Sequence, residues 1–106
     1  MIEPMPELAD VSKLATDVSA LLKVMAHPLR LKILFVLLDG EKTVGWLEQN
    51  LDKPQAQISH HLAKLRFDDL VCCRRSGRLA YYRIGHPHAL LLVTQLLRMF
   101  PEQEGE

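Results

Sequence analysis

The sequence of 106 residues has no long hydrophobic segment and no basic leader at its start. Its longest unbroken apolar run, Ile33 to Leu38, is far shorter than the roughly 20 residues of a membrane-spanning helix. The first ten residues carry Glu3, Glu7 and Asp10, whereas a secretory signal needs a basic start followed by an apolar stretch. These absences predict a cytoplasmic protein with no membrane partner.

Cysteines and catalytic motifs are scarce as well. The two cysteines, Cys72 and Cys73, are adjacent, which excludes a disulfide framework and fits a reducing compartment. The sequence has no glycine-rich phosphate loop, no HExxH motif and no nucleophile elbow. A chain of this length can form one core but has little room beside it for a substrate pocket. We therefore expect a single domain over residues 1–106 that is not an enzyme.

Charge is balanced over the whole chain but unevenly distributed. The formal net charge is zero. Residues 53–83 nevertheless carry seven basic side chains against two acidic ones, whereas residues 1–52 carry five basic and eight acidic ones. Positive charge confined to one segment is typical of a surface that binds an anionic partner.

Apolar periodicity predicts two helices in the first part of the chain. Apolar residues spaced three and four apart indicate a helix over about 9–25. Pro28 favours the start of a second helix, which runs to Leu38 before Asp39-Gly40 ends it. Because Ile33 to Leu38 is apolar on every side, this segment should lie at the centre of the core.

A helix-turn-helix is predicted over about residues 43–67. Thr43 is a suitable N-cap for a short helix, and a turn at Asp52-Lys53-Pro54 leads to a further helix that ends near Phe67. In that second helix Ile58, Leu62 and Leu65 face inward, and His61 lies near the same side. The opposite face is polar, as in a helix that contacts DNA.

The period then changes to that of a β-hairpin over about residues 70–84. The segments Leu70 to Arg75 and Leu79 to Ile84 flank Ser76-Gly77, so a two-residue turn there would place Arg75 opposite Arg78. A final helix is expected over about 86–100. The predicted fold is mainly α with a small β-hairpin, in the element order of a winged helix-turn-helix.

Three segments resemble the ArsR/SmtB family of bacterial repressors. They are LLKVMAHPLRLKILFVLL, QAQISHHLAKLRFDDLV and RRSGRLAYYRI, in the order and spacing of that family. The resemblance implies a homodimer built from the first and last helices, in which each protomer presents one recognition helix and one wing to DNA. It also implies that an inducer, often a metal ion or a thiol-reactive species, releases the DNA.

The residues themselves also favour a dimer. The helices at about 9–25 and 86–100 carry more apolar side chains than so small a core can enclose, and an exposed apolar stripe is a liability. A two-fold interface buries both stripes. The predicted interface residues are Leu14, Val18, Leu21, Leu92 and Leu96.

Eight side chains are candidate DNA contacts, against the alternative that they form an ordinary solvated polar surface. On the recognition helix, Gln55, Gln57 and His60 can bond to base edges in the major groove. Ser59 and Lys64 are better suited to phosphates. In the hairpin, Arg74, Arg75 and Arg78 are suited to phosphate or to a narrow minor groove.

The cysteine sites of the family are missing from this sequence. The resemblance places Thr43 and Gly45 where arsenic and cadmium sensors carry Cys-x-Cys. It places Phe35 and Pro101 where a sulfur-sensing branch carries its two cysteines. Neither type of site can therefore form here.

A weakened zinc-type site remains at the last helix. His86 and His88 match its first half, while Met99 and Glu102 stand at its second half. Imidazole and carboxylate groups suit zinc, but methionine is a poor ligand for it. We therefore expect no firmly bound cofactor and surface histidines near the start of a helix, with a weakly bound zinc-type ion at His86, His88 and Glu102 as the alternative.

Cys72 and Cys73 offer a possible redox signal. Strand alternation sends their side chains to opposite faces, and the neighbouring arginines could make one thiol reactive. Ordinary packing is the alternative.

The predicted function is that of a dimeric, sequence-specific transcriptional regulator. We expect a repressor that binds a palindromic operator in double-stranded DNA and is released by a metal ion or a thiol-reactive signal. The alternative is a winged helix that docks on an acidic protein partner, for which aromatic residues would be expected on the recognition helix. A thiol-redox enzyme is a third class, but the sequence lacks the Cys-x-x-Cys spacing.

Overall fold

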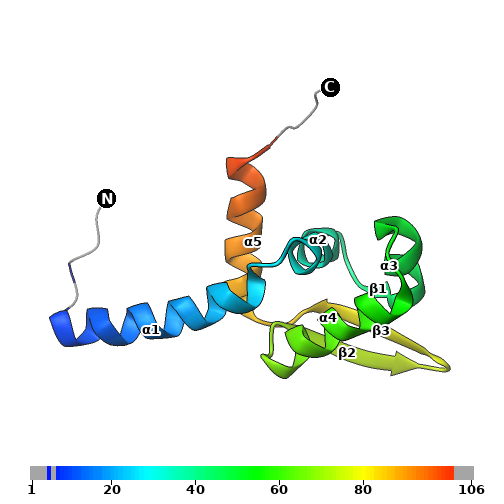
Figure 1. Ribbon diagram of the computed structural model, residues 1–106, viewed down its shortest axis with the longest axis horizontal. Helices are drawn as coiled ribbons and strands as arrows, with labels where there is room; N and C mark the ends of the chain where they lie inside the picture. The colour runs from blue at the N-terminus through cyan, green and yellow to red at the C-terminus, as the bar shows by residue number, and fades with distance from the viewer. Residues whose placement is uncertain (1–4, 6, 102–106) are drawn as a thin grey trace.

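The computed structural model describes residue 5 and residues 7–101. Within these residues it contains five helices and three strands, and Figure 1 shows α1 extending away from the other elements. The elements are α1 (Leu8–Met25), α2 (Pro28–Leu37), β1 (Lys42–Thr43), α3 (Val44–Leu51), α4 (Gln55–Phe67), β2 (Val71–Ser76), β3 (Leu79–Ile84) and α5 (Pro87–Met99). The prediction of a mainly helical fold with a hairpin in winged helix-turn-helix order is confirmed.

The core lies between α2, α4 and the base of the sheet. Ile33 and Leu34 of α2 are completely buried, as the uniformly apolar segment predicts. From α4, the inward trio Ile58, Leu62 and Leu65 packs into the same cluster. The apolar residues of α4 thus fix which of its faces remains outside.

Three helices begin with a side-chain cap. Thr43 caps α3 as predicted, since its hydroxyl accepts a hydrogen bond from the Trp46 amide at 3.1 Å. His27 caps α2 in the same way through Nδ1. His86 caps α5, with Nδ1 accepting bonds from the amides of His88 and Ala89 at 3.1 and 3.2 Å. The two histidine caps satisfy amides that no helical carbonyl can reach.

The sheet differs from the prediction in one strand and in its register. The short strand β1, which the sequence analysis missed, pairs with β3 to give the antiparallel order β1-β3-β2. The expected pairing of Arg75 with Arg78 is wrong. Arg75 lies opposite Ala80, and the turn is formed by Gly77 and Arg78, one residue later than expected. Gly77 has φ +65°, so the glycine takes the first turn position, where a side chain would be strained.

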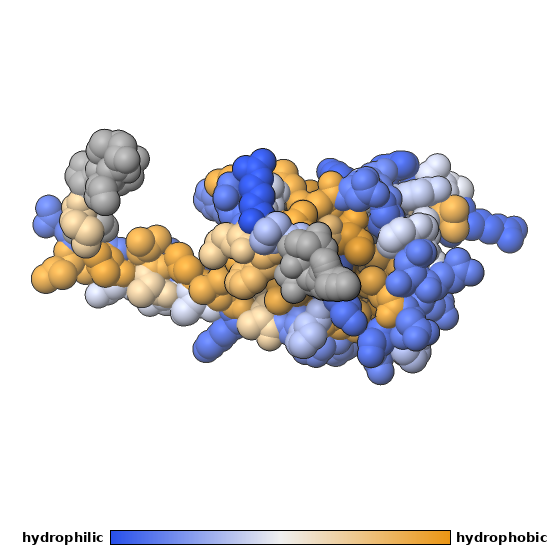
Figure 2. Space-filling view, turned by 90° about the horizontal axis from the view of Figure 1, so that it is seen from above, coloured by the Kyte–Doolittle hydropathy of each residue, from blue (hydrophilic) through white to orange (hydrophobic). Residues whose placement is uncertain are grey.

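Apolar and polar surfaces separate along the molecule. Figure 2 shows hydrophobic residues along α1 and the adjoining side of the body, and hydrophilic residues at the end that carries α3 and the hairpin. None of the helices in the described residues has both the length and the apolar character needed to cross a lipid bilayer.

Candidate DNA-binding surface

The outer face of α4 presents the polar side chains predicted from the sequence. The side chains of Gln55, Gln57, Ser59, His60 and Lys64 are all exposed. The core residues on the opposite side hold this face outward. Between α3 and α4, Asp52 adopts a left-handed conformation with φ +54°, which ends α3 and turns the chain into α4. The surface is therefore presented by a helix whose opposite face is buried in the core.

His61, the neighbour of His60, is buried as predicted and joins α4 to α2. Its Nδ1 accepts a hydrogen bond from Arg30 Nε at 3.0 Å, and Arg30 also donates to the carbonyl of Val24 at the end of α1. The His27 ring lies 4.3 Å from the His61 ring. Burial, followed by the positive charges possible on His27, Arg30 and His60, lowers the pKa of His61. The sequence did not reveal that Arg30 holds His61 in place, because the two residues are 31 positions apart in the chain.

Lys64 has partners at the C-terminal end of α4. Its ammonium lies 3.2 Å from an Asp68 carboxylate oxygen and 5.6 Å from the centre of the exposed Phe67 ring. The ammonium makes a single contact with the carboxylate and both side chains are partly open to solvent, so the pair is weak and Lys64 can exchange partners.

The wing meets the helix-turn-helix at a small cavity. This cavity, of about 260 Å³, is lined by Thr43, Val44, Gly45, Gln55, Arg75, Arg78, Leu79 and Ala80. It joins the first residue of α4, the start of α3 and two wing arginines. The start of a helix and two guanidinium groups are both attractive to an anion. The structure thus brings Gln55, Arg75 and Arg78 together.

Arg74 lies elsewhere. Its Nε is 3.0 and 2.9 Å from the two carboxylate oxygens of Glu41, and its Nη2 is 2.8 Å from Glu41 Oε1. The guanidinium also stacks over Tyr81 at 4.6 Å. The hydrogen bond between the two side chains raises the pKa of Arg74 and lowers that of Glu41. Of the eight candidate DNA contacts, Arg74 has the most complete set of partners within the protein.

The two cysteines occupy opposite faces of β2, as alternation predicts. Cys72 lies opposite Arg83 and Cys73 lies opposite Tyr82. Both are free thiols and partly buried. Burial and the adjacent Cys73 thiol raise the pKa of the Tyr82 hydroxyl. The reactivity of the Cys72 and Cys73 thiols stays a prediction.

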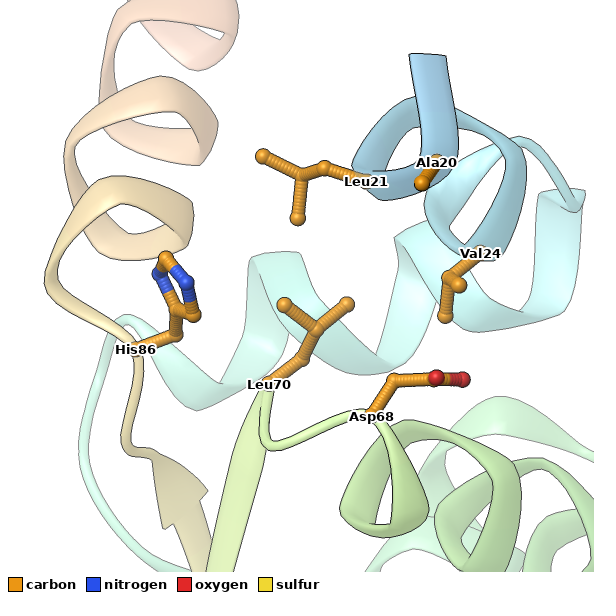
Figure 3. Close-up of a pocket in the computed structure, with 6 residues that line it drawn as sticks. All are labelled: Ala20, Leu21, Val24, Asp68, Leu70 and His86. Carbon is orange, nitrogen blue, oxygen red and sulfur yellow. The ribbon is translucent and has the colours of Figure 1, made fainter. Parts of the chain in front are cut away.

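His86 and His88 offer an incomplete metal site. Their rings lie 5.4 Å apart, and Nδ1 of His86 is already occupied by its cap. Figure 3 shows His86 at a cavity of about 210 Å³, where the Asp68 carboxylate points away from it on the far side of Leu70. The described residues contain no group of three or more His, Cys, Asp or Glu side chains that could hold an ion. They therefore fall short of the donor set zinc requires. Glu102 lies outside them, so the zinc-type site stays a prediction.

Comparison with known proteins places these features in a family. Residues 27–71 match the model of the bacterial regulatory protein arsR family. The biofilm growth-associated repressor of Xylella fastidiosa is 38% identical over 97 residues, which cover 92% of this chain and 85% of that protein. The transcriptional activator HlyU of Vibrio cholerae is 36% identical over 93 residues, which cover 88% of this chain and 86% of that protein.

Solved structures agree with the sequence matches. The transcriptional repressor BigR from Xylella fastidiosa has a TM-score of 0.85 at 36% identity, with 94% of this chain and 99% of that chain covered. Reduced HlyU from Vibrio cholerae has a TM-score of 0.84 at 35% identity, with 88% of this chain and 98% of that chain covered. All these relatives are named as regulators of transcription and none as an enzyme. The chain belongs to the ArsR family of bacterial transcriptional regulators.

Proposed function

We propose that this protein is a homodimeric, cytoplasmic repressor that binds a palindromic operator through α4 and the wing. The observation that carries the proposal is the cavity where Gln55, Arg75 and Arg78 meet beside the exposed face of α4. One surface thus offers amide groups suited to base edges and guanidinium groups suited to phosphates. The first two turns of α4 also favour DNA over an acidic protein partner, because they expose Gln55, Gln57 and His60 and carry no Phe, Tyr or Trp; the exposed Phe67 is the last residue of the helix.

The dimer is supported by the apolar surface of α1 and α5. Leu14 and Val18 are 53% and 40% exposed, and Leu21, Leu92 and Leu96 are only half-buried. An apolar hollow of about 590 Å³ between α2 and α5 is lined by Leu31, Phe35, Leu96, Leu97 and Phe100. A second copy of the chain related by two-fold symmetry would cover this surface.

The DNA contacts are tested by selecting bound sequences from a random duplex pool and then varying salt. Two-fold symmetry predicts a palindrome whose half-sites lie about one or two helical turns apart. Arg78→Ala should weaken binding to every duplex and lower the slope of log affinity against log salt by about one. Gln57→Ala should leave that slope unchanged and relax the base preference. The same slope and the same selected sequence in both variants would contradict the proposal.

The release signal is proposed to act through a wing thiol. Peroxide would oxidise a cysteine thiol to sulfenic acid with release of water, and a second peroxide would give the anionic sulfinate. Cys73 lies on the same face of β2 as Arg75, two residues away, so that a sulfinate there would repel the operator. A direct electrostatic effect of this kind needs no long conformational path.

Operator titrations with and without peroxide test this signal. Wild-type affinity should fall after oxidation, whereas Cys73→Ser should bind equally well under both conditions; Cys72→Ser is the matched control. Unchanged wild-type affinity under peroxide would remove the thiol proposal. Stoichiometric zinc in the purified protein, lost when His86 and His88 are changed to Ala, would favour the α5 site instead.

A further inference from the structure

We infer that Glu41 is a positioning residue for the wing, and that it withholds Arg74 from the operator. The inference rests on the proposed DNA-binding function and revises the sequence-based expectation for Arg74. It assigns the ion pair between these two residues the task of holding the wing against the helix-turn-helix.

The pair spans the whole sheet. Tyr81 on the central strand β3 lies opposite Thr43 on β1 and opposite Arg74 on β2. Directly opposed residues share a face of a sheet, so the Arg74 side chain reaches over Tyr81 toward the far edge. There it meets Glu41, which immediately precedes β1. The Arg74 side chain thus links β2, across β3, to the residue that leads into β1.

The far end of this connection is the start of the helix-turn-helix. Thr43 is both the last residue of β1 and the N-cap of α3, through its bond from the Trp46 amide. A change at Glu41 or Arg74 therefore alters how the hairpin is held relative to α3. Arg75 is on the opposite face of β2, where it lines the cavity that contains Gln55. The pair thus fixes the wing while leaving Arg75 and Arg78 available.

Electrostatics favour the same assignment. Two guanidinium nitrogens of Arg74 already bond to the Glu41 carboxylate, so a phosphate would have to displace a bidentate, oppositely charged partner. If Arg74 left, the Glu41 carboxylate would lose its hydrogen-bonded partner near the DNA and keep only the more distant charge of Arg83. Phosphate neutralisation by this wing is therefore expected from Arg75 and Arg78 alone.

The salt dependence of operator binding tests the assignment, with neighbouring arginines as matched variants. Arg75→Ala should lower the slope of log affinity against log salt by about one, because one phosphate contact is lost. Arg74→Ala should leave the slope at the wild-type value. Glu41→Gln should steepen it by about one, because the released Arg74 can then bind phosphate. An equal decrease in Arg74→Ala and Arg75→Ala would overturn the inference.

A second measurement on the DNA-free protein separates this inference from the proposed function. Amide hydrogen exchange in β3 should become faster in Arg74→Ala and in Glu41→Gln, and stay at the wild-type rate in Arg75→Ala. Unchanged exchange in both variants of the pair would overturn the positioning role. If the wild-type protein bound no duplex, the proposed function would fail, while the exchange rates would still decide whether the pair holds the wing.

Discussion

The two ends of this molecule satisfy their side chains in different ways. At the end formed by the wing and the helix-turn-helix, polar groups find partners within the chain, such as Arg74 with Glu41 and Arg30 with His61. Along α1 and α5, apolar side chains such as Leu14 and Leu91 lie open, at 53% and 60% exposure. The first surface is complete in one protomer, whereas the second needs another apolar surface to cover it. Under the proposed function, the first surface would bind DNA and the second would bind another copy of the chain.

The largest effect should come from a charge on the open surface. Leu14→Asp would bury an unpaired carboxylate in the proposed dimer interface, so the dimer should dissociate. Operator affinity should fall by about 100-fold or more, because binding of two half-sites by one dimer is lost. Sedimentation and operator titration measure the two effects. Ser12→Asp, on the exposed polar side of the same helix, is the matched control and should change neither.

A core substitution sharpens the comparison by acting on the protomer itself. Leu62 of α4 is 1% exposed and lies in the core cluster. Leu62→Ala should therefore lower the free energy of unfolding by about 2–5 kcal/mol. Leu14→Ala, on the open surface, should lower the stability of the dimer while leaving the folded protomer nearly unchanged. Chemical denaturation at several protein concentrations measures both. A concentration-independent loss of the same size in each variant would contradict the distinction between the two surfaces.

Acid should produce a smaller effect, confined to the end that carries α4. Because the pKa of His61 is lowered in the folded protein, the unfolded chain binds a proton more readily than the folded chain below about pH 6.5. The contribution of His61 to stability is therefore complete above that pH and is lost as pH falls toward the lowered pKa. Protonation of Nδ1 would also break the bond from Arg30.

Thermal unfolding between pH 5 and pH 8 measures this effect. His61→Gln should flatten the decrease in stability below pH 6.5, and a glutamine oxygen can still accept a bond from Arg30. His88→Gln, at an exposed position, is the control and should retain the wild-type pH dependence. An unchanged pH profile in His61→Gln would contradict the role assigned to the buried histidine.

Local patterns in the sequence predicted the elements that follow a clear period. The apolar run of α2, the inward trio of α4 and the Thr43 cap all follow from neighbouring residues. The strand β1 was missed because two residues are too short to show alternation. The hairpin turn was placed one residue early because Ser76-Gly77 and Gly77-Arg78 are both reasonable turns, and only the pairing along the whole hairpin selects one.

Long-range partners account for what the sequence could not predict at the candidate site. Glu41 and Arg74 are 33 residues apart, and Arg30 and His61 are 31 residues apart. No periodicity connects such residues, since only the folded sheet and the packing of α2 on α4 bring them together. The basic segment predicts an anionic partner, but it gave equal weight to three wing arginines, of which Arg74 alone is paired with Glu41 in the folded structure.

The central claim is that two chains bind one palindromic duplex through α4 and the wing. Sedimentation velocity of the purified protein mixed with the selected duplex tests it most directly. We expect a complex of two chains per duplex at low salt that dissociates as salt is raised, and a dimer in the absence of DNA. A stable monomer that binds the duplex one to one, or no binding to any duplex at low salt, would contradict the account.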